Sequence, residues 1–180
     1  MTIEALAPGH LDALRHFLEH LPEGDRTFIK EDLDDPACAA AWVRGEGRAS
    51  RWAALDETNR EILGVVFVAR LTGWSAHVGD LRLVVAEVAR GRGVGRALAR
   101  HAVVQAAESG LTKLVVEVVA EQDGTVGMFE ALGFRAEGML RDHVRDRDGG
   151  RHDLIVLAHS VEEQAALMAL TGIDEAVGEA

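Results

Sequence analysis

The chain of 180 residues contains no tyrosine, three prolines and a single cysteine. One cysteine, Cys38, excludes an internal disulfide and a thiolate metal cluster, and it indicates the reducing cytoplasm as the compartment. The longest apolar runs, such as residues 62–69, are far shorter than the roughly 20 residues that a membrane-spanning helix needs. Residues 1–7 contain an acidic residue and no basic one, so they do not resemble a signal peptide. We therefore expect no membrane partner.

Positive charge is also scarce, with 19 Lys and Arg against 30 Asp and Glu and a formal net charge of −11. A surface of this sign repels phosphate backbones, so no nucleic acid is expected as a partner, whereas a cationic acceptor would suit the charge. Hydrophobic residues make up 48% of the chain, which at this length is enough for the core of one domain. We expect a single domain over residues 1–180, with residues 161–180 as a C-terminal helix or tail.

The N-terminal third carries two helical patterns. Leucines recur at helical spacing up to Leu21 and stop at Pro22, which predicts a helix over residues 9–21. Asp35 followed by Pro36 is typical of a helix start, so a second helix is predicted to run to residue 43. The residues between the two helices are polar and are predicted to be irregular.

The rest of the chain alternates between strand and helix patterns. The predicted strands are residues 52–55, 62–71, 80–85, 114–119, 134–146 and 152–160, and the predicted helices are residues 94–110, 126–132 and 162–170. The strand over residues 114–119 is almost wholly apolar, which is the pattern of a buried central position. This order predicts the α/β (α+β) class, with a mixed central β-sheet flanked by helices.

A loop rich in glycine and arginine joins a predicted strand to a predicted helix at residues 90–96. Glycines permit positive φ and close backbone approach, and a helix start attracts anions, so the loop is a candidate site for a pyrophosphate. The dinucleotide-binding fingerprint would need a glycine where Arg96 stands, and the Gly-Lys-Ser/Thr end of a Walker A loop does not occur. A mononucleotide- or phosphate-binding α/β domain remains an alternative.

The pattern Arg-x-x-Gly-x-Gly at residues 90–95 resembles the phosphate-loop signature of the GNAT superfamily of acyl-CoA-dependent N-acyltransferases. The resemblance continues through the following strand and helix to Gly133 and Phe134. It implies a V-shaped opening between two central parallel strands and acetyl-CoA as the co-substrate. It also implies acetyl-CoA contacts at Leu83, Val84, Val85, Arg90, Gly91, Arg92, Gly93, Val94, Gly95, Arg96, Gln122 and Phe129.

The same resemblance implies direct attack by an amine acceptor, either a protein lysine or a small molecule, without a covalent enzyme intermediate. Residues 114–122, with Met128 and residues 133–134, look most like the acyltransferase domain of bacterial protein-lysine acetyltransferases. In that subgroup an acidic residue at the position of Asp80 serves as the base. No metal is expected, because the eight histidines are scattered without ligand spacing.

Two carboxylates are candidates for the general base that an amine nucleophile needs, Asp80 and Glu117. Asp80 follows Gly79 and has an alternative reading as a turn residue, while Glu117 has one as a buried ion pair or a group at a cleft edge. Many members of the superfamily have, where this chain has Phe129, a tyrosine that protonates the leaving thiolate. Its absence leaves open a non-catalytic acyl-CoA-binding module, and the sequence also leaves the oligomeric state open, a homodimer included.

Overall fold

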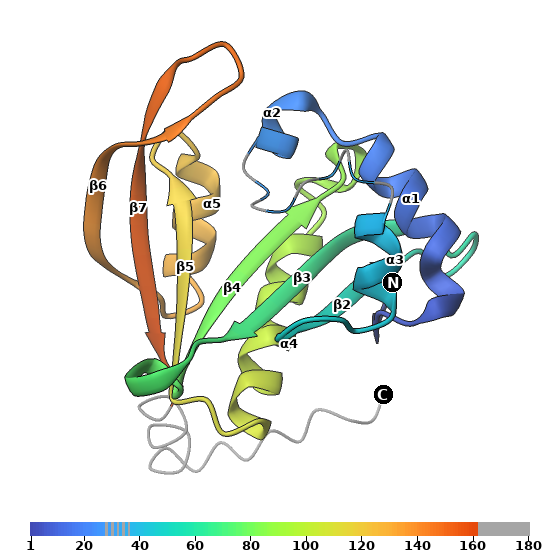
Figure 1. Cartoon of the computed structure of the whole chain (residues 1–180), viewed down its shortest axis with the longest axis horizontal. Helices are drawn as coiled ribbons and strands as arrows, with labels where there is room; N and C mark the ends of the chain where they lie inside the picture. Colours follow the sequence, from blue (N-terminus) through green and yellow to red (C-terminus); the bar gives the residue numbers. More distant parts are fainter. Residues whose placement is uncertain (28, 30, 32, 34, 36, 162–180) are drawn as a thin grey trace.

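A seven-stranded mixed sheet, with the strand order β1-β2-β3-β4-β5-β7-β6, forms the centre of the molecule (Figure 1). The computed structural model describes residues 1–27, 29, 31, 33, 35 and 37–161, so the predicted helix over residues 162–170 lies outside the described residues. The strands are β1 (Thr2–Ala5), β2 (Ala49–Leu55), β3 (Ile62–Arg70), β4 (Val78–Val85), β5 (Lys113–Val119), β6 (Arg135–Arg145) and β7 (Arg151–Ser160).

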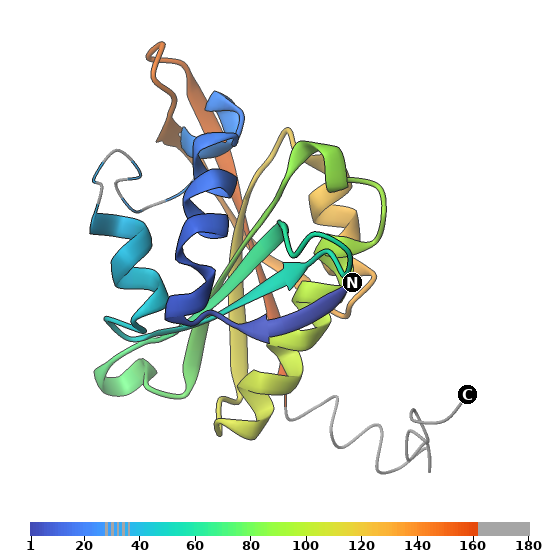
Figure 2. The same cartoon turned by 90° about the vertical axis from the view of Figure 1, so that its right-hand side faces the viewer.

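Helices cover both faces of the sheet, as the turned view in Figure 2 shows. The helices α1 (Leu11–Glu19) and α3 (Ala37–Val43) lie on one face, and α4 (Val94–Glu108) and α5 (Asp123–Glu130) lie on the other. The short helix α2 (Glu23–Thr27) and three 3₁₀ turns, η1 (Pro8–His10), η2 (Gly73–Ser75) and η3 (Glu87–Ala89), are the remaining elements of the described residues. None of the helices in the described part is both long and apolar enough to cross a bilayer.

The two faces have separate hydrophobic cores because side chains alternate along each strand. Val65 and Phe67 of β3 pack with α1 and α3, whereas Val66 and Val68 pack with α4. Burying these apolar side chains supplies the main favourable free energy of the fold. The same alternation decides on which face each polar side chain of β4 and β5 lies.

Most predicted elements are confirmed, and two were missed. The carboxylate of Asp35 accepts a hydrogen bond from the backbone N–H of Ala37 at 2.8 Å, which confirms that residue as the start signal of α3. The strand β1 has only four residues, too few for a periodic pattern to be recognised. The helix α2 lies where the polar composition predicted an irregular segment.

The V-shaped opening lies between the parallel strands β4 and β5. Their ladder joins Val78–Leu81 to Lys113–Val116 and then ends. Beyond that point β4 stays paired with β3 as far as Val85, and β5 stays paired with β7 as far as Val119. The two strands therefore diverge at their carboxyl ends, as the resemblance implied.

Candidate active site

Both predicted carboxylates lie on one face of the sheet, beside this opening. Asp80 is aligned with Val115 across the ladder, so by alternation Glu117 is the next β5 residue on that face. Leu81 and Val116 point to the opposite face, where they belong to the core under α4. Glu117 is exposed and is the first β5 residue beyond the last ladder pair. The structure thus places it at the point where the strands separate.

Asp80 lies within the ladder and is held by an arginine. Nε of Arg82 donates to Oδ2 of Asp80 at 3.0 Å, and Nη1 of Arg82 donates to Oε1 of Glu31 at 2.7 Å. Partial burial acts to lower the pKa of Arg82, but the two carboxylates outweigh it and raise the pKa overall. Arg82 therefore remains charged and joins β4 to the segment that follows α2.

The glycine loop after β4 has the conformation that its glycines predict. Gly91 and Gly93 have φ values of +69° and +82°, which other residues rarely adopt, and Gly93 directly precedes α4. No acidic residue lies in the first turn of α4, and Arg92 and Arg96 are exposed. The loop therefore offers backbone N–H groups, the positive end of a helix and two arginines to an anion.

Arg90 differs from the other two arginines of the loop. Its guanidinium donates to the backbone carbonyl of Val85, with Nε at 3.3 Å, and it forms an ion pair with Asp25 of α2. This side chain therefore ties the end of β4 to α2, while Arg92 and Arg96 face solvent. Of the three arginines, those two are the better placed to meet a phosphate.

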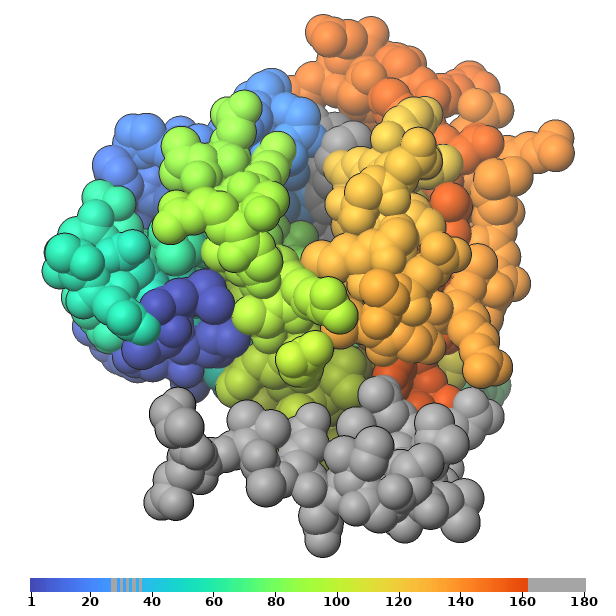
Figure 3. All heavy atoms as spheres, turned by 180° about the vertical axis from the view of Figure 1, so that it is seen from behind, coloured from blue at the N-terminus to red at the C-terminus, as the bar shows by residue number. Residues whose placement is uncertain are grey.

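The helix α5 packs beside the start of α4. A Cβ added to Gly95 would lie 3.3 Å from Sδ of Met128, so a larger residue at this position would require the Met128 side chain to shift. Gln122 is the residue before α5, and its backbone carbonyl accepts a hydrogen bond from Thr125 N at 2.8 Å. Figure 3 shows a hollow between the residues that lead into α4 and those that lead into α5.

The segment from Leu83 to Val85 borders this region on β4, beyond the ladder with β5. Leu83 and Val85 pack toward α4, and Val84 packs toward the α1 side. Phe129 on α5 is only 1% exposed and makes an edge-to-face contact with Phe134 at 5.0 Å between ring centroids. Its ring is therefore a core element.

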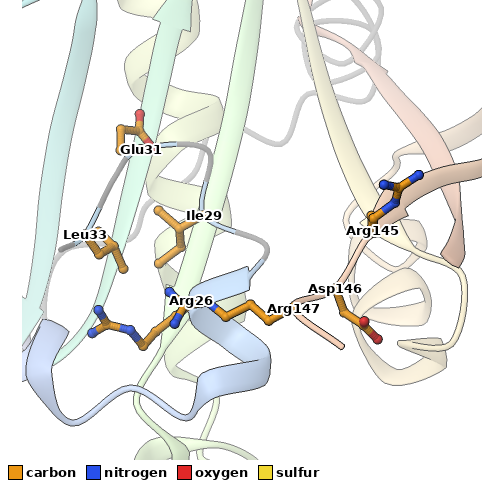
Figure 4. Close-up of a pocket in the computed structure, with 7 residues that line it drawn as sticks. All are labelled: Arg26, Ile29, Glu31, Leu33, Arg145, Asp146 and Arg147. Atoms are coloured by element: carbon orange, nitrogen blue, oxygen red, sulfur yellow. The ribbon is translucent and has the colours of Figure 1, made fainter. Parts of the chain in front are cut away.

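A pocket of about 270 Å³ opens between the segment around α2 and the tip of the β6–β7 hairpin (Figure 4). Its lining consists of three arginines, two acids and two aliphatic residues: Arg26, Arg145, Arg147, Glu31, Asp146, Ile29 and Leu33. Because Glu31 also pairs with Arg82, the pocket borders the face of β4 that carries Asp80.

The hairpin tip is joined to the end of β5 through a histidine. Nε2 of His152 lies 2.9 Å from Oδ2 of Asp146, and Nδ1 lies 3.3 Å from Oε1 of Glu121, just after β5. The hydrogen bond with Asp146, followed by that with Glu121, raises the pKa of His152. The same contact with His152 is the main cause of the lowered pKa of Asp146.

Sequence reasoning missed Arg82, Glu31 and the pocket. Arg82 could have been found from its spacing, because it lies two residues after Asp80 on a predicted strand and so shares the face of Asp80. Glu31 could not have been found in this way, since it lies in a polar segment whose position depends on tertiary contacts. Among the described residues, no group of three or more His, Cys, Asp or Glu side chains is arranged to hold a metal ion.

Comparison with known proteins places these features in a family context. The model of the acetyltransferase (GNAT) family matches residues 13–134. A comparison with curated proteins finds no match.

Solved structures with the same fold include several acetyltransferases, among them the following three. A GNAT-family acetyltransferase from Streptococcus pneumoniae has a TM-score of 0.76 and 20% identity, over 88% of this chain and 98% of that one. A ribosomal-protein-alanine N-acetyltransferase from Brucella melitensis has a TM-score of 0.73 and 20% identity, over 89% of this chain and 99% of that one. A spermidine N-acetyltransferase chimera from Vibrio cholerae and hSSAT has a TM-score of 0.74 and 18% identity, over 92% of this chain and 99% of that one. At these identities the likeness supports the fold.

Proposed function

The chain belongs to the GNAT family of acetyltransferases, and we propose that it transfers the acetyl group of acetyl-CoA to a primary amine at the opening between β4 and β5. The observation that carries the proposal is the end of the β4–β5 ladder at Leu81 and Val116. The glycine loop follows at the end of β4, and Glu117 lies beside the opening. The opening therefore brings together three parts: the glycine loop as a site for an anion, the free edge of β4 beyond the ladder, and the carboxylate of Glu117.

The residues around the opening fit acetyl-CoA, which supplies an activated thioester. The loop from Gly91 to Gly95, with Arg92 and Arg96, would hold the diphosphate through backbone N–H groups and charge. Residues 83–85 and Gln122 would border the pantetheine arm. A backbone N–H of the β4 edge would stabilise the oxyanion that forms when the amine attacks.

We assign the general base to Glu117. An alkyl amine with a pKa near 10.4 is about three units from neutral at pH 7.4, which costs roughly 4 kcal/mol before attack. A carboxylate at the opening, directly or through a water molecule, removes that proton. Glu117 lies where the strands part, whereas Asp80 lies within the ladder and pairs with Arg82, so we assign Asp80 to positioning that arginine.

The departing thiolate has no tyrosine to protonate it, since the chain contains none. Phe129, at the position that the family resemblance pointed to, is buried against Phe134. A thiol with a pKa of about 8.5 is an adequate leaving group without an acid, and solvent at the open end of the cleft protonates it.

The test is to mix the protein with acetyl-CoA and a panel of primary amines and to follow thiol release, with acetyl-CoA binding measured separately by calorimetry. Amine-dependent thiol release supports the proposal. Binding of acetyl-CoA without release in the presence of any amine would indicate the non-catalytic module. A failure to bind acetyl-CoA, or equal affinity for a mononucleotide, would contradict the assigned site.

A further inference from the structure

The pocket between α2 and the hairpin tip is linked by side-chain contacts to both sides of the opening. On one side Glu31 of its lining pairs with Arg82 of β4 at 2.7 Å. On the other side Asp146 of its lining contacts His152, which in turn contacts Glu121 at the end of β5. The pocket is therefore joined to both strands of the opening, on the face that carries Glu117.

The two acids that line the pocket have basic partners, Arg82 and His152, that are not part of its lining. Glu31 faces Arg82, and Asp146 accepts from His152 at 2.9 Å and from the backbone N–H of Gly150 at 2.6 Å. Their negative charge is therefore offset in part within the protein, because Arg82 shares its single positive charge between Glu31 and Asp80. A ligand in the pocket meets carboxylates that already have partners.

Arg145 differs from the two acids of the lining. The side chain of Arg145 makes no hydrogen bond or ion pair with any residue that the structure describes, although it lines the pocket. Arg26 donates to the neutral carbonyl of Leu18 at 2.9 Å, and Arg147 pairs with the exposed Glu23 at 2.7 Å. A guanidinium has five N–H donors in a planar fork that matches a carboxylate or phosphate.

We propose that this pocket binds an anionic group of the acceptor, so that the enzyme acetylates a small amine that also carries a carboxylate or a phosphate. Arg145 is the principal ligand, Arg147 and Arg26 are its neighbours, and the amine extends toward Glu117. This inference rests on the proposed function. It also runs against the overall charge, because a chain of net charge −11 would by itself suit a cationic acceptor.

The size and lining of the pocket favour a small molecule over a protein chain. Its volume of about 270 Å³ is just below the range of roughly 300–1,000 Å³ that is usual for ligand sites, so it can hold only a small group. Ile29 and Leu33 supply an apolar wall for a short aliphatic segment between the anion and the amine. Both residues come from the segment after α2, opposite Arg145 at the end of β6 (Figure 4).

The experiment compares amines that differ only in the anionic group. The pairs are 4-aminobutyrate with 4-aminobutanamide, and O-phosphoethanolamine with ethanolamine, and a lysine-containing peptide is the third arm. We expect kcat/KM to be at least about tenfold higher for one or both anionic members, since a hydrogen-bonded charge pair contributes that much or more. The first pair reports on a carboxylate and the second on a phosphate.

Arg145→Gln should remove most of that preference by lowering kcat/KM about tenfold for the anionic amines and leaving it unchanged for the neutral ones. Arg135→Gln, at the other end of the same strand and also exposed, is the matched control and should change neither. Acetyl-CoA affinity should be unchanged in both variants, which shows that the fold and the phosphate loop are intact.

Each alternative outcome contradicts a distinct statement. A preference for the neutral amines or for the peptide, or an equal effect of Arg145→Gln on both members of a pair, would overturn the anionic acceptor and leave the proposed function standing. No thiol release with any amine, despite acetyl-CoA binding, would overturn the proposed function and this inference with it.

Discussion

Nε and Nη2 of Arg82 both lie against the same carboxylate oxygen of Asp80, Oδ2, at 3.0 and 2.9 Å. The pair lies on one strand, two residues apart, so both side chains share the face that leads to the pocket. Nη1 of the same arginine reaches Glu31 at 2.7 Å. Asp80 therefore sets the direction in which Arg82 holds the segment that lines the acceptor pocket.

Replacement of Arg82 should affect the acceptor side of the reaction. We expect Arg82→Gln to raise KM for the amine about tenfold, because Glu31 loses its partner and its charge becomes free to repel an anionic acceptor. Arg82→Lys should recover only part of the loss, since an ammonium lacks the planar fork that contacts both carboxylates. Steady-state kinetics with calorimetry check this, and a loss of acetyl-CoA affinity with an unchanged amine KM would contradict it.

The assignment of the base predicts a difference between the two carboxylates. Glu117→Gln should lower kcat about a hundredfold or more, the usual contribution of general base catalysis, with little change in acetyl-CoA affinity. Asp80→Asn should have the smaller effect on kcat and should act on the amine KM through Arg82. Glu19→Gln, on the exposed end of α1, is the control. A larger loss of kcat in Asp80→Asn would reverse the assignment.

The phosphate loop is tested at the glycine that precedes α4. Gly93 has φ +82°, where an alanine is strained by about 1–2 kcal/mol. We expect Gly93→Ala to weaken acetyl-CoA binding at least tenfold, because relief of that strain moves the loop N–H groups. Gly138→Ala on β6, where φ is ordinary and the added Cβ meets nothing within 4 Å, should bind normally. Equal affinities would show that the loop does not hold the coenzyme.

How far the sequence could predict the molecule depends on the range of the contacts involved. The helix α4 has an apolar face that recurs over several turns, and the strand β5 is an almost unbroken apolar run, so both were predicted. The strand β1 was missed because its stability comes from pairing with β2, as in the alignment of Ile3 with Ala54. The pocket was missed for the same reason: Glu31 and Arg145 are far apart in the sequence and meet only through the folded hairpin.

The burial of Phe129 leads to a prediction about stability. Its ring is 1% exposed and packs edge-to-face on Phe134, so Phe129→Tyr would introduce a hydroxyl group into the core. A buried hydroxyl without a partner costs about 1–3 kcal/mol. We expect the free energy of unfolding in urea to fall by this amount and kcat not to rise. An increase in kcat would mean that the ring reaches the thiol and that the missing tyrosine limits the rate.

His152 should make the acceptor site dependent on pH. Both ring nitrogens lie against carboxylate oxygens, Nε2 at 2.9 Å from Asp146 and Nδ1 at 3.3 Å from Glu121, and only the imidazolium donates at both positions. These bonds raise the pKa of His152 above its usual value of about 6.5. Their stabilising effect is therefore fully present below about pH 6.5 and is lost as the pH rises through the raised pKa.

The hairpin tip that carries Arg145 and Arg147 should accordingly loosen on the alkaline side, and KM for the acceptor should rise there. The pKa of Asp146 is lowered, so its contribution is present above its unfolded value of about 3.9 and is lost only as the pH falls through the folded pKa. His152→Gln should have a high KM for the acceptor at every pH, without the rise on the alkaline side. His143 is an exposed residue of β6, and His143→Gln should keep the pH dependence of the wild type. NMR titration of the His152 ring gives the pKa directly, and a value at or below about 6.5 would show that the two carboxylates do not hold the imidazolium in solution.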